Sequence, residues 1–226
     1  MDQEIVREYY PDGTLSLEKT MHDGLLHGPL REFDRQGNPV SIAHFKEGRL
    51  HGMSMQFGDE GQVIQDANYQ DGDLHGSFRV FDAGGCLEHE VPYRRGLAHG
   101  EAKYYAEGAL RYLIEYRDGE IHGMFVQHND AGRVMARLRF RGGKQDGLSS
   151  WFNEEGGLIR TSEYRDGLLD GETVDYESDG SVRERAPYQQ NLLHGEVIRF
   201  DRDGNETERV AYREGVKLER TTQDAV

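Results

Sequence analysis

Apolar and polar residues alternate along short stretches of the chain. In one such stretch Val134, Ala136, Leu138 and Phe140 take the even positions, and arginine takes most of the odd ones. A period of two is typical of a β-strand with one covered face, whereas an amphipathic helix repeats every 3.6 residues. No glycine-free window shows a convincing helical period. The pattern therefore predicts an all-β protein.

Glycine recurs at a fixed interval and divides the alternating stretches. The interval is 24 residues, with one shorter step of 23 between Gly100 and Gly123. Such a period indicates tandem structural repeats. The column that ends each Leu-His-Gly phrase comprises Gly28, Gly52, Gly76, Gly100, Gly123, Gly147, Gly171 and Gly195.

Two aromatic columns keep the same interval, each at the end of a segment of about eight residues. Asp-Gly pairs such as Asp71-Gly72 and Asp166-Gly167 supply the positive-φ conformations that join antiparallel strands. Each repeat is therefore expected to be a β-hairpin. The first column is Phe33, Phe57, Phe81, Tyr105, His128, Phe152, Tyr176 and Phe200, and the second is Phe45, Tyr69, Tyr93, Tyr116, Phe140, Tyr164, Tyr188 and Tyr212.

The repeats predict an elongated antiparallel β-meander of about eight 24-residue hairpins, or about sixteen strands. We expect an N-terminal half-repeat or cap in residues 1–23, the tandem hairpins in residues 24–215 and a C-terminal tail in residues 216–226. A single hairpin is marginal in water, so each repeat should depend on its neighbours.

The columns resemble the MORN-repeat family, in the variant form common in bacteria. The segments "YQDGDLHGSFRVFDAGGCL" and "YRDGEIHGMFVQHNDAGRV" carry the resemblance, which covers nearly the whole chain. The resemblance implies an extended antiparallel sheet. It also implies a scaffold or binding role, because bacterial proteins of this kind are often assigned as antitoxins or immunity proteins. Departures from the motif are Gln145, Asp146, Asp170 and His128.

Composition narrows the kinds of partner. The net charge is −15, from 42 acidic and 27 basic side chains, which disfavours nucleic acid and anionic membranes and suits a basic protein. A merely well-solvated surface is the alternative. Cys86 is the one cysteine, so no intramolecular disulfide forms, and neither a secretory signal nor an apolar segment of membrane length occurs. These features predict a cytoplasmic protein.

Catalytic and metal-binding motifs are absent or incomplete. The recurring histidines, such as His51 and His75, would lie roughly 10 Å apart, too far to converge on one zinc ion, so a role in the turns is the better interpretation. Cys86 and His89 are close in sequence, but an incidental thiol explains the cysteine more simply. We expect no enzyme activity, no cofactor and no metal.

Positions that vary between repeats are candidates for binding. The second and fourth residues after the Leu-His-Gly glycine should face away from the first aromatic column. In the middle repeats these residues are large, and aromatic clusters of this kind are typical of interface hot spots. The alternative is a second small core inside a curled sheet. The residues are Phe78, Val80, Tyr104, Phe125 and Trp151.

A basic stripe is the second candidate surface. Arg137, Arg139 and Arg141, with Arg133, have the opposite parity to the apolar residues of the same segment and should lie on the outer face, where Lys144 could join them. Solvated charge is the default explanation. Pairing with carboxylates of neighbouring strands or with an acidic partner loop is the alternative.

The leading functional hypothesis is a non-enzymatic immunity or antitoxin protein that neutralises a cognate toxin, such as a basic toxin domain, by direct binding. A structural scaffold or a homo-oligomer, including a homodimer, is the second hypothesis. A membrane-peripheral role is third, because the negative charge opposes it.

Overall fold

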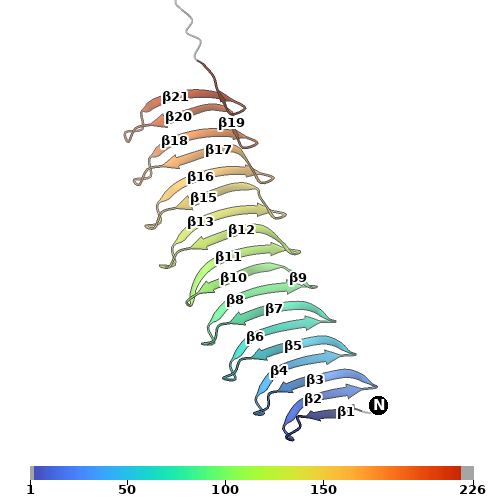
Figure 1. Ribbon diagram of the computed structural model, residues 1–226. Coiled ribbons are helices and arrows are strands. Elements are labelled where there is room, and N and C mark those ends of the chain that lie inside the picture. Colours follow the sequence, from blue (N-terminus) through green and yellow to red (C-terminus); the bar gives the residue numbers. More distant parts are fainter. Residues whose placement is uncertain (1–2, 220–226) are drawn as a thin grey trace, which may run out of the picture. The chain divides into compact units, whose positions relative to one another are not determined.

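The computed structural model describes residues 3–219. These residues form 22 antiparallel β-strands and no helix, which confirms the predicted all-β meander of hairpins (Figure 1). The chain divides into two compact units, a division that the sequence did not predict. Within the described residues, unit 1 comprises residues 3–110 and 115–120, and unit 2 comprises residues 111–114 and 121–219.

Unit 1 is an antiparallel meander in which β1 to β8 each pair with the next strand along the chain, and β9 and β10 both pair with β8. Its strands are β1 (Gln3–Tyr9), β2 (Leu15–His22), β3 (Leu25–Phe33), β4 (Pro39–Lys46), β5 (Arg49–Phe57), β6 (Val63–Gln70), β7 (Asp73–Phe81), β8 (Leu87–Arg94), β9 (Leu97–Ala98) and β10 (Gly100–Ala106). Strand β11 (Ala109–Arg117) contributes residues to both units.

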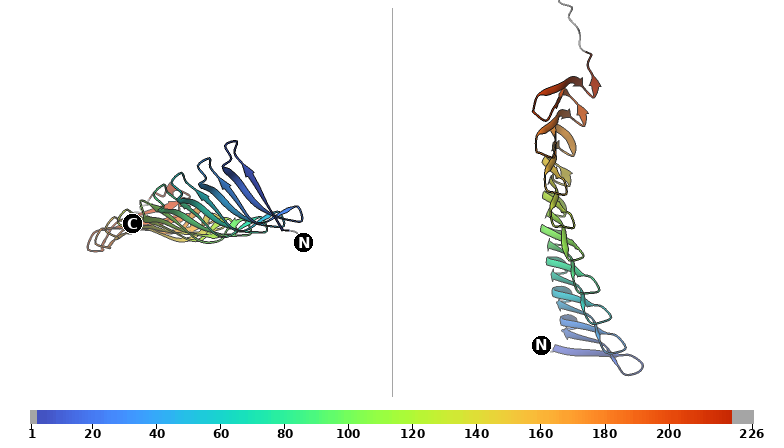
Figure 2. Two further views of the ribbon diagram at one scale, coloured as in Figure 1. Left: turned by 90° about the horizontal axis from the view of Figure 1, so that it is seen from below. Right: turned by 90° about the vertical axis from the view of Figure 1, so that its left-hand side faces the viewer.

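Unit 2 repeats the same antiparallel arrangement. Its strands are β12 (Glu120–His128), β13 (Val134–Arg141), β14 (Lys144–Gln145), β15 (Gly147–Phe152), β16 (Leu158–Arg165), β17 (Leu168–Tyr176), β18 (Val182–Gln189), β19 (Leu192–Leu193), β20 (Gly195–Phe200), β21 (Glu206–Arg213) and β22 (Val216–Lys217). The strands of both units are curved along their length (Figure 2).

Three predicted strands are each interrupted by one residue. His99, Asp146 and His194 separate β9 from β10, β14 from β15 and β19 from β20. The glycine that follows each of them has φ between +106° and +119°, but Gly28 and Gly123 have similar φ inside the uninterrupted strands β3 and β12, so this conformation alone does not cause the break. If each interrupted pair is counted once, the eight repeats supply the sixteen expected strands.

Two kinds of turn alternate along the meander. At one end of each hairpin, residues such as Asp71-Gly72 both have positive φ, which matches the right-handed twist of the strands. At the other end a polar side chain organises a longer turn, as where the Asp34 carboxylate accepts a hydrogen bond from the Asn38 amide at 2.8 Å. The local sequence therefore determines both turns.

The structure refines two of the predicted boundaries. The division between units falls within β11, beside the single 23-residue repeat, whose turn at Glu107-Gly108 is shortened to two residues. The predicted tail begins with the short strand β22, and its residues 220–226 lie outside the described part of the chain.

Candidate functional site

Strand pairing shows which side chains share a face in unit 2. Directly paired residues of adjacent strands project to the same side of a sheet. Phe125 pairs with Leu138, and Trp151 pairs with Ala136, two residues before Leu138 on the same strand. These four residues therefore lie on one side, which we call the aromatic face of unit 2.

Unit 1 has an aromatic face built in the same way. Val80 and Tyr104 both pair with His89, and the His89 ring stacks between Phe78, at 6.0 Å, and Tyr104, at 5.7 Å. Burial first, and then the neighbouring Tyr116 hydroxyl, raise the pKa of Tyr104 to about 12. His89, which the sequence suggested only as a neighbour of Cys86, completes an aromatic ladder.

The structure divides the five predicted aromatic-face residues between the two units. Phe78, Val80 and Tyr104 lie in unit 1, and Phe125 and Trp151 lie in unit 2. All five are half-buried, because neighbouring rings and strands cover part of each side chain. They therefore contribute to packing and still present apolar surface.

Trp151 forms one wall of an open groove of about 600 Å³ on the aromatic face of unit 2. Tyr164, whose ring centre lies 6.5 Å from that of Trp151, and Tyr188 also line the groove. Small buried residues form its floor, where the Thr173 hydroxyl donates a hydrogen bond to the Ser162 hydroxyl at 3.0 Å. The groove thus combines aromatic walls with a floor of small, partly polar residues.

A charged cluster that the sequence did not predict lies in the same groove. Asp175, whose side chain is only 10% exposed, binds Arg160 and Arg183. The Arg160 guanidinium holds the pKa of the Asp175 carboxyl below its ordinary value, and Arg183 adds to the effect. Because Arg160 and Asp175 meet across β16 and β17, only the strand register reveals the pair.

The predicted arginine stripe lies on the opposite side of unit 2, which we call the charged face. Arg137 and Arg139 alternate with the aromatic-face residues of β13 and are exposed. The Arg137 guanidinium lies 5.6 Å from the Phe152 ring centre, and Arg141 forms an ion pair with Asp146 at 3.3 Å. The arginines and the aromatic residues therefore belong to separate surfaces.

The recurrent histidines contact turns. The Asp71 amide approaches His51 Nδ1 at 3.4 Å, and the Asp118 amide approaches His99 Nδ1 at the same distance. Asp146, which replaces a histidine of the motif, accepts from the Asp166 amide in the same way. Residues 3–219 contain no group of three potential metal ligands and no helix long and apolar enough to cross a membrane.

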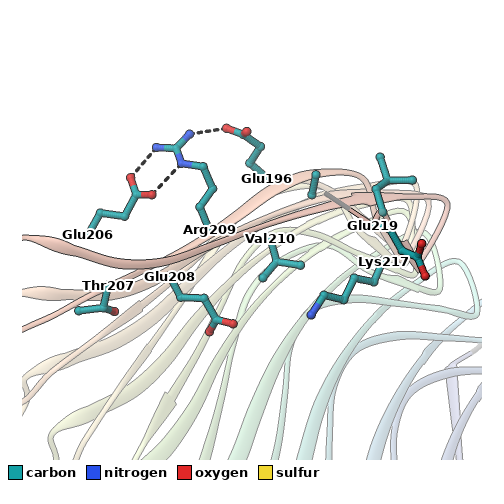
Figure 3. Close-up of a pocket in the computed structure, with 10 residues that line it drawn as sticks. Glu196, Glu206, Thr207, Glu208, Arg209, Val210, Lys217 and Glu219 are labelled. Atoms are coloured by element: carbon teal, nitrogen blue, oxygen red, sulfur yellow. Dashed lines mark hydrogen bonds and ion pairs between the residues drawn. The ribbon is translucent and has the colours of Figure 1, made fainter. Parts of the chain in front are cut away.

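A second hollow lies at the C-terminal end of unit 2. Arg209 crosses it and forms ion pairs with both Glu206 and Glu196 (Figure 3). Val210 and Glu208 project to the other side of the strand (Figure 3). Four charged residues of this hollow, Glu196, Glu206, Glu208 and Arg209, are paired within the chain, and no aromatic residue among those described lines it. We therefore regard the Trp151 groove as the better candidate site.

Comparison with known proteins gives no family assignment. No family model and no curated protein sequence match the chain. One matching solved structure is described as the crystal structure of TcdB2-TccC3. It is 13% identical over 92% of this chain, with a TM-score of 0.19, and the match spans 14% of that structure's chain. A likeness this weak carries no argument about function.

Proposed function

We propose that this chain is a non-enzymatic repeat protein that binds another protein through the Trp151 groove. The observation that carries the proposal is the position of Trp151, half-buried at the wall of an open groove with Tyr164. Tryptophan and tyrosine in such partly enclosed positions dominate the energetics of many interfaces. Their packing keeps the rings ordered before a partner arrives, which lowers the entropy cost of binding.

A basic protein is the partner that the overall charge favours. The net charge of −15 would accelerate encounter with a positively charged surface and repel acidic competitors. Together with the resemblance to bacterial MORN-type repeats, this charge supports a role as a cytoplasmic immunity or antitoxin protein that covers a basic toxin domain. The aromatic groove would provide most of the affinity, and the acidic surface would increase the association rate.

The test begins with identification of the partner and continues with its affinity. The tagged chain is used to capture proteins from cells of the source organism, and a stoichiometric partner is produced pure for calorimetry. Trp151→Ala should weaken binding by roughly 2 kcal/mol, a factor of about 30 in Kd. Tyr9→Ala is the control, because it removes an exposed aromatic side chain from the other unit and should leave Kd unchanged. An unchanged Kd for Trp151→Ala would refute the proposed site.

A homo-oligomeric scaffold remains the competing function. Light scattering on the purified chain distinguishes the two, because an obligate homodimer would have twice the mass of the 25.8 kDa chain at every accessible concentration. A monomer that binds a basic protein supports the interaction role.

A further inference from the structure

Four arginines in the strands of the charged face of unit 2 are matched by carboxylates, whereas Arg213 on β21 is not matched within the described part of the chain. Arg165 pairs with Asp170 at 3.2 Å, and Arg185 lies 3.8 Å from Glu172. Arg141 pairs with Asp146, and Arg209 pairs with two glutamates. In an acidic chain, nearby carboxylates are plentiful, so this matching is the expected arrangement.

Arg137 and Arg139 lack such a carboxylate partner. Within residues 3–219 neither arginine forms an ion pair with a carboxylate. The residues that face Arg137 from the adjacent strands are Val126 and Ser150, and Met124 faces Arg139. Two positive charges therefore lie side by side on β13, and the residues paired directly with them are neutral. The Asp146 amide donates a hydrogen bond to the Arg139 carbonyl, but the Asp146 carboxylate pairs with Arg141.

Both arginines are held by packing, Arg137 through its guanidinium and Arg139 through its stem. Arg137 lies over the Phe152 ring, and Arg139 covers Gly147 so closely that a Cβ there would come within 2.9 Å of its Cδ. Packing of this kind restricts the rotamers of a long side chain before a ligand binds, which lowers the entropy cost of binding. Exposed Leu148, on β15 beside this pair, adds apolar surface. Glu163 faces Leu148 from the far side, so Leu148 separates that carboxylate from the arginines.

Strand geometry fixes the spacing of the two charges. Residues two apart on one strand are separated by about 6.6–6.8 Å, the same repeat as alternate side chains of an extended peptide. An extended segment with carboxylates at alternate positions can thus present one carboxylate to each guanidinium. Arginine suits this role because its planar donors can bind a carboxylate at two points.

We propose that Arg137 and Arg139, with Leu148 beside them, form a docking surface for an extended acidic protein segment with carboxylates at alternate positions. Charge complementarity favours this occupant, because here the chain, over residues 3–219, leaves two adjacent arginines without a carboxylate partner. Nucleic acid is disfavoured, because two cations release few counterions and the chain carries a net charge of −15. The surface lies opposite the Trp151 groove and does not depend on the function proposed for that groove.

The probe is a fluorescein-labelled peptide of four Thr-Glu repeats, titrated with the full chain at low ionic strength and followed by anisotropy. A peptide of four Thr-Gln repeats is the neutral control. The double variant Arg137→Gln/Arg139→Gln should bind the acidic peptide at least about tenfold more weakly than the wild-type chain. Arg165→Gln/Arg185→Gln changes the net charge equally on the same face but removes arginines that already have partners. This variant should change affinity less than about twofold.

Three results would overturn the proposal. The first is no binding of the acidic peptide by the wild-type chain. The second is an equal loss of affinity in both double variants, which would show that only the net charge of the chain matters. The third is equal or stronger binding of a labelled eight-nucleotide oligothymidine, which would assign the surface to phosphates. Thermal unfolding by circular dichroism checks that each variant is folded, and Trp151→Ala should leave peptide binding unchanged.

Discussion

Arg160 and Asp175 form a two-point ion pair across β16 and β17. Arg160 Nε lies 2.5 Å from Asp175 Oδ1, and Arg160 Nη2 lies 2.9 Å from Oδ2. Arg183 on β18 approaches the same carboxylate at 3.2 Å. One largely buried carboxylate therefore links three consecutive strands beside the Trp151 groove.

Replacing Asp175 with asparagine should destabilise the protein. The substitution preserves shape but leaves two arginines without their charged partner. Because both arginines are about half exposed, water screens part of the loss, and we expect a decrease of about 1–2 kcal/mol in the free energy of unfolding. Urea unfolding measures this difference. Asp203→Asn, at an exposed turn position of the same unit, is the control and should have little effect.

The contribution of Asp175 should depend on pH. Its folded-state pKa is lowered, chiefly by Arg160, so the ionised carboxyl stabilises the fold above the unfolded-state pKa of about 3.9. That contribution is lost as the pH falls through the lower folded-state pKa. The difference in unfolding free energy between wild type and Asp175→Asn should therefore be constant at neutral pH and shrink below about pH 4. A difference that stays the same down to pH 2.5 would contradict the ionic explanation.

Gly171 and Gly180 should respond differently to alanine. Both have positive φ, +130° and +87°, which costs an L-residue about 1 kcal/mol or more. At Gly171 an added Cβ would also lie 2.7 Å from the Cβ of Glu163, whereas at Gly180 nothing lies within 4 Å. We expect Gly171→Ala to destabilise the protein by at least about 1 kcal/mol more than Gly180→Ala. Equal denaturation midpoints would show that the strand moves to accommodate the new methyl group.

The hairpins were predictable because their determinants are local. Each turn carries its own signal, as at Asp71-Gly72, and period-two alternation marks the strands beside it. The pairing of Arg160 with Asp175 was not predictable in the same way. These residues are 15 positions apart, and they meet only because of a register that includes a shift between Ser162 and Tyr164. A displacement of one residue would place the two charges on opposite faces.

For the candidate surfaces, the sequence predicted which face each residue lies on but not which residues pair. Parity along β13 correctly separated Arg137 and Arg139 from Leu138. Which arginines find a carboxylate depends on the next strand, so the sequence could not distinguish Arg141, which pairs with Asp146, from the unmatched pair. Whether the aromatic residues and arginines bind partners stays a prediction.

Ser149 offers a test of polarity on the aromatic face of unit 2. Its side chain is fully buried, and its hydroxyl has no hydrogen-bond partner, although Ser162 faces it directly on β16. Ser162 instead accepts a hydrogen bond from Thr173. An unpaired buried hydroxyl is unfavourable, so Ser149→Ala should raise the free energy of unfolding by up to about 1 kcal/mol. Thr173→Val should lower it by about 1 kcal/mol, because it leaves Ser162 without its donor. If Ser149→Ala destabilised the protein as much as Thr173→Val, the Ser149 hydroxyl would have to form a hydrogen bond in solution.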